Sequence, residues 1–183
     1  MNTFRLIQSD YKKYIKYGNN FFSTFFLTQG FWAVFYYRIA HFISTLKVPI
    51  VKQFLQLLCV FGQKIIEITT GISIPASVKI GHSFYIGHFG GIIINSNTII
   101  GNNCNIAQGV TFGVSGVNEN RGTPVIGDNV YIGANSVIVG KIKVGNNVLI
   151  GACSLVNSDV EDCSVMLGVP AKKVSNKGSE GYI

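Results

Sequence analysis

The chain has 183 residues, which fits one domain with a single hydrophobic core better than two independent domains. Charged residues make up only 13% of it, so a monomer would expose much apolar surface and association of subunits is expected. The net charge of +7 favours an anionic partner. A nucleic-acid partner is not expected, because the basic residues do not interleave with aromatic residues in a recognised binding motif.

The N-terminal part of the sequence lacks the signals of export and of membrane insertion. The first 18 residues, MNTFRLIQSDYKKYIKYG, contain no apolar core or cleavage site of a secretory signal. The aromatic stretch 21–37 is interrupted by polar residues and followed directly by Arg38, so it is too polar to span a bilayer. We therefore expect a cytoplasmic protein, and we leave open a peripheral contact with the inner face of the membrane.

Two helices are predicted before the sequence pattern changes near residue 70. Apolar residues recur at helical spacing between Phe31 and Ile43, and a second apolar stretch runs from Val51 to Thr69 and ends before Gly71. A stack of strands that begins after this point would expose unpaired backbone at its open end. We therefore expect residues 1–70 to form a helical cap and an oligomerisation region.

An internal repeat dominates the rest of the chain. The repeated aliphatic or aromatic positions are Ile80, Ile86, Ile94, Ile100, Ile106, Phe112, Ile126, Ile132, Ile138, Val144, Ile150 and Val156. Their spacing of six, with two breaks, predicts a triangular parallel β-helix in which three short strands make one coil. Corner sequences such as 101–103 and 127–129 combine Gly with Asn or Asp, which tolerate left-handed backbone angles. The predicted fold class is mainly β, with this β-helix over residues 71–166.

The two breaks in the repeat predict loops, because a solenoid extrudes its insertions. The first break, between Ile86 and Ile94, holds two extra residues and contains His88 among glycines. The second spans fourteen positions between Phe112 and Ile126, where twelve would keep the frame. Its polar, Gly-rich sequence predicts an extended loop at 113–125 that can reach a neighbouring face.

The cysteines and histidines limit the kinds of chemistry that the chain can carry out. The four cysteines have neither CxxC nor metal-ligand spacing, so we expect reduced, packed thiols and no metal site. His41 lies on a predicted helix and His82 at a regular corner, where a packed or solvated imidazole is the simpler interpretation. His88 lies in the first break, where flanking glycines let a substrate approach closely, and is the candidate functional histidine.

Five segments resemble the serine acetyltransferase family of hexapeptide-repeat acyltransferases and, more closely, its shorter relatives that O-acetylate capsular or exopolysaccharide sugars of the colanic-acid type. They are GFWAVFYYRIAHF (30–42), IPASVKIGHSFYIGHFGGIII (74–94), IGNNCNIAQGVTFG (100–113), VIGDNVYIGANSVIVG (125–140) and LGVPAKKV (167–174). The resemblance implies left-handed coiling and a homotrimer, with a dimer of trimers left open. It also implies acetyl-CoA as co-substrate.

The same resemblance implies where CoA would bind. It places CoA in a groove between adjacent β-helices, along Ala134 and Ala152. It puts Lys172 and Lys173, in the C-terminal segment and tail 167–183, near the adenosine phosphates, although a solvated basic tail is the alternative for these lysines. The backbone near Gly113 is implied as the oxyanion partner.

The resemblance also makes His88 the general base, but the chain departs from the family around it. Ser73 stands where the family has the aspartate that pairs with the histidine, and the acid directly before the histidine is missing. Glu67 is the best remaining candidate to orient the imidazole. Gly90 and Arg121 are the candidate contacts of the acceptor.

These departures decide the acceptor that we predict. Without a carboxylate, the ammonium group of serine would be held poorly, whereas a neutral sugar hydroxyl needs no charged partner. The predicted function is acetyl-CoA-dependent O-acetylation of a sugar hydroxyl in a capsular or other surface polysaccharide, or in its precursor. Two alternatives stay open: a serine O-acetyltransferase of cysteine biosynthesis, and a non-catalytic β-helix scaffold.

Overall fold

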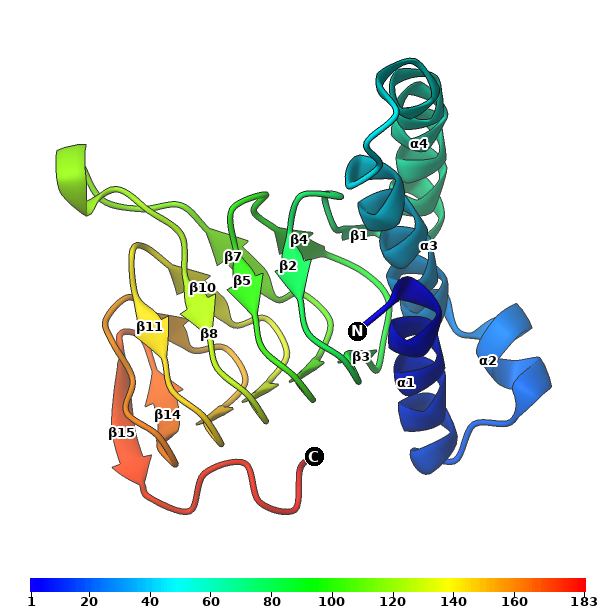
Figure 1. The fold of residues 1–183 in the computed structure, drawn as a ribbon. Coiled ribbons are helices and arrows are strands. Elements are labelled where there is room, and N and C mark those ends of the chain that lie inside the picture. Colours follow the sequence, from blue (N-terminus) through cyan, green and yellow to red (C-terminus); the bar gives the residue numbers. More distant parts are fainter.

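The computed structural model describes all residues from 1 to 183. Four helices come first, followed by a β-helix whose coils stack away from them (Figure 1). The helices are α1 (Thr3–Lys16), α2 (Phe21–Leu27), α3 (Gln29–Ser44) and α4 (Pro49–Thr70). In Figure 1, α1 and α3 lie against the first coil at one end of the β-helix, and α4 packs beside α3 and projects beyond the prism.

The strands of the β-helix are short. They are β1 (Ile72–Ser73), β2 (Lys79–Ile80), β3 (Tyr85–Ile86), β4 (Ile92–Ile94), β5 (Ile99–Ile100), β6 (Asn105–Ile106), β7 (Thr111–Gly113), β8 (Val125–Ile126), β9 (Tyr131–Ile132), β10 (Val137–Val139), β11 (Lys143–Val144), β12 (Leu149–Ile150), β13 (Leu155–Val156), β14 (Val165–Gly168) and β15 (Ala171–Ser175). A single 3₁₀ turn, η1 (Asn118–Asn120), lies between β7 and β8.

The strands form three sheets, which are the three faces of the prism. Face A has the order β1-β4-β7-β10-β13, face B β11-β8-β5-β2 and face C β15-β14-β12-β9-β6-β3. The chain visits A, B and C in turn, and all pairs between successive coils are parallel. Only β15 folds back antiparallel, onto β14. The predicted triangular parallel β-helix is confirmed.

The repeated apolar positions fill the interior. Each of the twelve predicted positions is at most 8% exposed, and they belong to one continuous core. Burial of a Val, Ile or Phe side chain contributes about 1.5–3 kcal/mol each, so the repeat itself supplies the main stabilisation of the coils. The period of six therefore identified the core correctly.

The corners between faces B and C show why Gly and Asn recur there. Asn103, Asn129 and Asn147 have φ angles of 55–56°, the left-handed conformation predicted for these corners. The preceding glycines have another role, because a Cβ on Gly101 would lie 2.5 Å from the carbonyl oxygen of Gly127. Asparagine thus makes the turn, while glycine lets successive coils approach.

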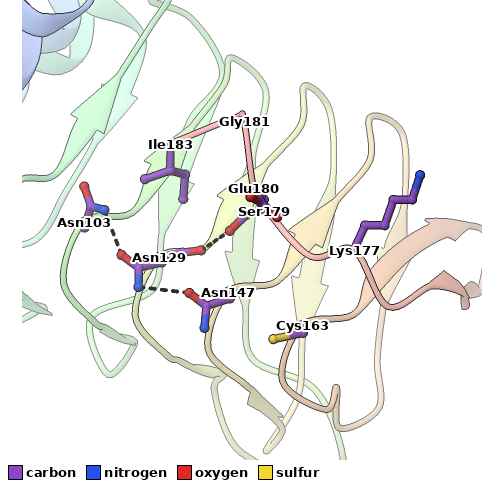
Figure 2. Close-up of a pocket in the computed structure, with 9 residues that line it drawn as sticks. All are labelled: Asn103, Asn129, Asn147, Cys163, Lys177, Ser179, Glu180, Gly181 and Ile183. Atoms are coloured by element: carbon purple, nitrogen blue, oxygen red, sulfur yellow. Dashed lines mark hydrogen bonds between the residues drawn. The ribbon is translucent and has the colours of Figure 1, made fainter.

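An asparagine ladder follows this corner, as Figure 2 shows. Asn103 Nδ2 donates to Asn129 Oδ1 at 2.7 Å, and Asn129 Nδ2 donates to Asn147 Oδ1 at 3.0 Å. Lys13 Nζ, from α1, donates to Asn103 Oδ1 at 2.7 Å and so ties the helical cap to the ladder. The C-terminal tail covers the ladder, where Ser179 Oγ donates to the Asn129 carbonyl oxygen at 2.6 Å.

The buried lysine at the end of this ladder makes stability depend on pH. Burial lowers the pKa of Lys13 from its usual value of 10.5 to about 8. Between these values the unfolded chain binds more protons, so stability rises with pH through this window. We expect the unfolding free energy of the wild type to rise by about 2 kcal/mol relative to Lys13→Met between pH 7 and pH 10. Urea unfolding at both pH values measures this, and a pH-independent difference would contradict it.

The extended loop differs from the prediction in the size of its insertion. Phe112 on face A and Ile126 on face B are separated by a single corner, which Ile94 and Ile100 turn with the normal spacing of six. The fourteen positions therefore contain eight extra residues rather than two. Counting positions in the sequence missed this, because an insertion as long as one whole six-residue repeat leaves the hexapeptide frame unchanged. The loop carries η1 and projects away from the prism (Figure 1).

The helical cap contains more helix than the sequence predicted. The two predicted helices correspond to α3 and α4, and α4 is capped at its C-terminus by Gly71, which has a left-handed φ of 66°. The helices α1 and α2 were not predicted. A buried ion pair joins α1 to α3, with Arg38 Nε 2.8 Å from Asp10 Oδ2. None of the four helices combines the length and apolar character that crossing a bilayer requires.

Candidate active site

His88 lies on an exposed bulge at the corner between faces C and A. The bulge connects β3 to β4 and is anchored by the backbone of Gly90, whose N–H donates to the Thr70 carbonyl at 2.9 Å. The carbonyl of Gly90 accepts from the Gly109 N–H of the next coil, also at 2.9 Å. The C-terminus of α4 and the second coil therefore hold the bulge from both sides, while the imidazole stays exposed.

A pocket of about 230 Å³ opens beside this imidazole. Its lining residues are Asn19, Leu27, Thr28, Gln29, Gly30, Tyr85, Gly87, His88 and Phe89. The junction of α2 and α3 reaches this place because a Cβ on Gly30 would lie only 2.3 Å from the Ile86 carbonyl oxygen, so α3 begins in direct contact with β3. Sequence reasoning missed the contribution of residues 19–29, which no local motif marks.

Glu67, the predicted orienting acid, has other partners in the chain. Its carboxylate accepts hydrogen bonds from Ser73 Oγ at 2.7 Å, Lys64 Nζ at 2.6 Å and Gln63 Nε2 at 3.0 Å. Partial burial alone would raise the pKa of Glu67, but these hydrogen bonds outweigh it and lower that pKa. No hydrogen bond connects Glu67 with His88, so its role as an orienting residue stays a prediction.

Two of the predicted CoA contacts share the corner of His88. Ala134 and Ala152 lie between faces C and A on later coils, and the Cys153 N–H donates to the Ala134 carbonyl at 2.8 Å. Lys172 and Lys173 lie on β15, where Lys173 pairs with Glu161 at 2.7 Å. Ala134 and Ala152 therefore lie along the same edge of the prism as His88, whereas Lys172 and Lys173 lie on face C at its last strand.

Gly113 and Arg121 lie on the other edge of face A. Gly113 ends β7, and Arg121 belongs to the extended loop that begins there. Arg121 also lines a separate pocket of about 410 Å³ near Asn95. Within one chain, the predicted base His88 and Gly90 thus lie at one edge of face A, and Gly113 and Arg121 lie at the other.

Comparison with known proteins gives consistent relatives. Residues 123–158 match the family described as bacterial transferase hexapeptide (six repeats). The serine acetyltransferase of Bacillus subtilis is 30% identical over 161 residues, which are 88% of this chain and 71% of that protein. The chain belongs to the serine acetyltransferase family.

Other serine acetyltransferases agree with this assignment. That of Synechococcus elongatus is 33% identical over 81% of this chain but only 58% of its own length. A crystal structure of the Neisseria gonorrhoeae serine acetyltransferase in complex with serine has a TM-score of 0.80 and 30% identity, over 94% of this chain and 69% of that one. A serine acetyltransferase in complex with CoA has the same TM-score at 28% identity, over 94% and 70% of the two chains. The fold is therefore the left-handed β-helix of serine acetyltransferases.

These relatives correct the predicted function. We expected the closest likeness to capsular and exopolysaccharide O-acetyltransferases and a sugar hydroxyl as acceptor. The relatives found are serine acetyltransferases, so the sugar assignment is wrong and the serine alternative is the one supported. The error arose because we took the missing carboxylates as evidence about the identity of the acceptor.

Proposed function

We propose that this chain transfers the acetyl group of acetyl-CoA to the hydroxyl of serine, with His88 as the general base. The observation that carries the proposal is the exposed imidazole on a glycine-anchored bulge, beside a pocket of about 230 Å³. The relatives of this chain support serine and acetyl-CoA as its substrates, because structures of serine acetyltransferases have been solved in complex with serine and with CoA.

The chemistry needs one group that accepts and returns a proton. Neutral His88 takes the proton of the serine hydroxyl as its oxygen attacks the thioester carbonyl. The tetrahedral intermediate then collapses, the carbon–sulfur bond breaks, and the imidazolium returns the proton to the CoA thiolate. Backbone N–H groups near Gly113 would stabilise the oxyanion, while Ala134 and Ala152 would line the pantetheine groove and Lys172 and Lys173 would meet the adenosine phosphates.

The candidate site residues of one chain lie at two separate edges, and a homotrimer would bring the two sets together. Because His88 and Gly90 lie at one edge of face A and Arg121 at the other, the two sets face each other only when the C–A edge of one protomer meets the A–B edge of the next. The projecting loop 113–125 would then reach over the neighbouring His88. Residues 71–166 would be the catalytic domain, and the helices of residues 1–70 would assist assembly.

Acetyl transfer tests this proposal directly. We expect release of free CoA thiol from acetyl-CoA when L-serine is added, with O-acetylserine formed in equal amount. Binding of acetyl-CoA without turnover on serine would instead favour the non-catalytic scaffold. Absence of both binding and turnover would overturn the proposal.

An apolar face of α4 supports association of copies of this chain. Its residues recur at helical spacing and are each 53–83% exposed: Ile50, Phe54, Leu57, Leu58, Phe61, Ile65 and Ile68. Together they expose on the order of 800 Å², which is about what one partner contributes to a standard interface. This exceeds the apolar patch usual on a monomer, so we assign the face to contacts between protomers.

Charges placed in this face should weaken assembly. We expect Leu58→Glu with Phe61→Glu to shift the sedimentation coefficient toward that of smaller species, because carboxylates cannot be buried there without partners. The matched control is Gln53→Glu, which adds a carboxylate at an exposed position beside the face. Unchanged sedimentation with loss of binding to anionic vesicles would show that the face meets a bilayer instead.

A further inference from the structure

The pocket beside His88 contains no charged side chain. Besides the His88 imidazole, its polar side-chain groups are the amides of Asn19 and Gln29 and the hydroxyls of Thr28 and Tyr85. Asn19 Nδ2 already donates to Thr28 Oγ1 at 3.2 Å. Within one protomer, an acceptor that binds here is therefore held by neutral hydrogen bonds.

Tyr85 occupies the space beside the residue that precedes the base. A Cβ added to Gly87 would lie 3.3 Å from Tyr85 Cε1 and 3.7 Å from the Tyr85 hydroxyl oxygen. Tyr85 therefore packs directly against the position where a side chain at Gly87 would begin. The hydroxyl is brought to the place where a longer side chain directly before His88 would otherwise lie.

The ring of Tyr85 is held firmly, while its hydroxyl is free. Its centroid lies 4.6 Å from the ring of Tyr14 and 4.5 Å from that of Tyr17. Tyr14 is completely buried, and its own hydroxyl bonds the backbone of Ile86. No hydrogen bond within the chain uses the Tyr85 hydroxyl. Burial, and to a lesser extent Tyr17, raises the pKa of Tyr85, so it stays a neutral donor at the pH of an assay.

We infer that Tyr85 is an acceptor-binding residue, whose hydroxyl hydrogen-bonds the acceptor beside the hydroxyl that His88 deprotonates. The inference rests on the proposed acetyl transfer and adds to it the group that selects the acceptor. A fixed ring with a free hydroxyl is preorganised, so little conformational entropy is lost on binding. Because the Tyr85 hydroxyl is neutral, its contact does not distinguish an acceptor with a charged amine from an acceptor without one.

Tyr85→Phe tests this contact, because it keeps the ring and its stacking and removes only the hydroxyl. We expect kcat/KM for the acceptor to fall about 5- to 10-fold, the loss of one hydrogen bond, with the KM of acetyl-CoA and the far-UV spectrum unchanged. The control Tyr131→Phe removes a hydroxyl from the same face outside the pocket, and it should change neither value. A residue with only a structural role would instead alter both KM values or the melting temperature.

A second variant tests the neutral character of the pocket. The backbone at Gly87 is not left-handed, so Gly87→Asp needs only a small shift of the Tyr85 ring edge. We expect it to raise kcat/KM for serine relative to N-acetylserine, which carries no ammonium. An unchanged ratio would show that the acceptor binds away from Gly87 and Tyr85 and would overturn the inference.

A panel of L-serine, N-acetylserine, homoserine, threonine and ethanolamine separates the two proposals. If serine is acetylated and Tyr85→Phe is as active as the wild type, the inference fails and the proposed function stands. If another compound is acetylated but serine is not, the proposed function fails, and the effect of Tyr85→Phe on that compound decides the inference. If none is acetylated, both are overturned.

Discussion

Replacing His88 with alanine is expected to lower kcat for acetyl transfer by about 10²- to 10⁴-fold, the usual contribution of a general base. The exposed imidazole on the bulge makes no hydrogen bond within the chain, so its loss removes the proton acceptor without removing a structural contact. Stopped assays of CoA thiol release with saturating serine measure the effect. Acetyl-CoA binding by calorimetry should stay unchanged.

His82→Ala is the matched control for this variant. His82 is also exposed on the first coil, but it lies at the corner between faces B and C, and its imidazole bonds only the Ser83 hydroxyl, at 3.1 Å. We expect this variant to keep wild-type kcat. Equal activity of His88→Ala and His82→Ala would show that His88 is not the base.

Removal of the carboxylate of Asp10 is expected to destabilise the fold by about 3–5 kcal/mol, because it leaves an uncompensated buried charge. Arg38 is 1% exposed and bonds both oxygens of Asp10, the Ile80 carbonyl at 2.7 Å and the Gly81 carbonyl at 2.6 Å. Asp10 also accepts from the Phe84 N–H at 2.8 Å. The pair therefore joins α1 and α3 to the first coil, and Asp10→Ala should lower the midpoint of urea unfolding.

The double variant Asp10→Leu, Arg38→Met separates two contributions to stability, that of the buried charges and that of side-chain packing. Replacing both ions with apolar residues removes the unpaired guanidinium, so we expect most of the lost stability to return. Lys173→Ala, which breaks the exposed pair with Glu161, should change the unfolding midpoint far less. All proteins must be compared at one concentration, because association contributes to the apparent stability. An Asp10→Ala protein as stable as the wild type would contradict the prediction.

The features that sequence reasoning predicted correctly are local. The positions of the β-helix core followed from the period of six, and the left-handed corners followed from their asparagines. The insertion between Phe112 and Ile126 was underestimated, because spacing alone does not count whole repeats. The helix α1 escaped prediction because its buried Asp10 and Lys13 interrupt the apolar pattern that marks a packed helix, and α2 has only seven residues, too few to show a helical period.

The acceptor was the part of the function that sequence reasoning assigned wrongly. We inferred the acceptor from the absence of acidic residues at individual positions such as Ser73. That inference did not consider the side chains that surround His88 in space. The pocket places Tyr85 against Gly87 and brings Asn19 close to the base, although 66 residues separate Asn19 from Tyr85. No spacing or motif along the chain links these residues.

The sequence by itself determined the prism, because each position on a face or at a corner depends on neighbours a few residues away and on the coil directly above or below. Only the tertiary structure decided what surrounds His88. The N-terminal helices fold back on the first coil through the close contact of Gly30 with Ile86 and the buried pair of Asp10 and Arg38. These long-range contacts carry no period, so the pocket beside the base becomes visible only in three dimensions.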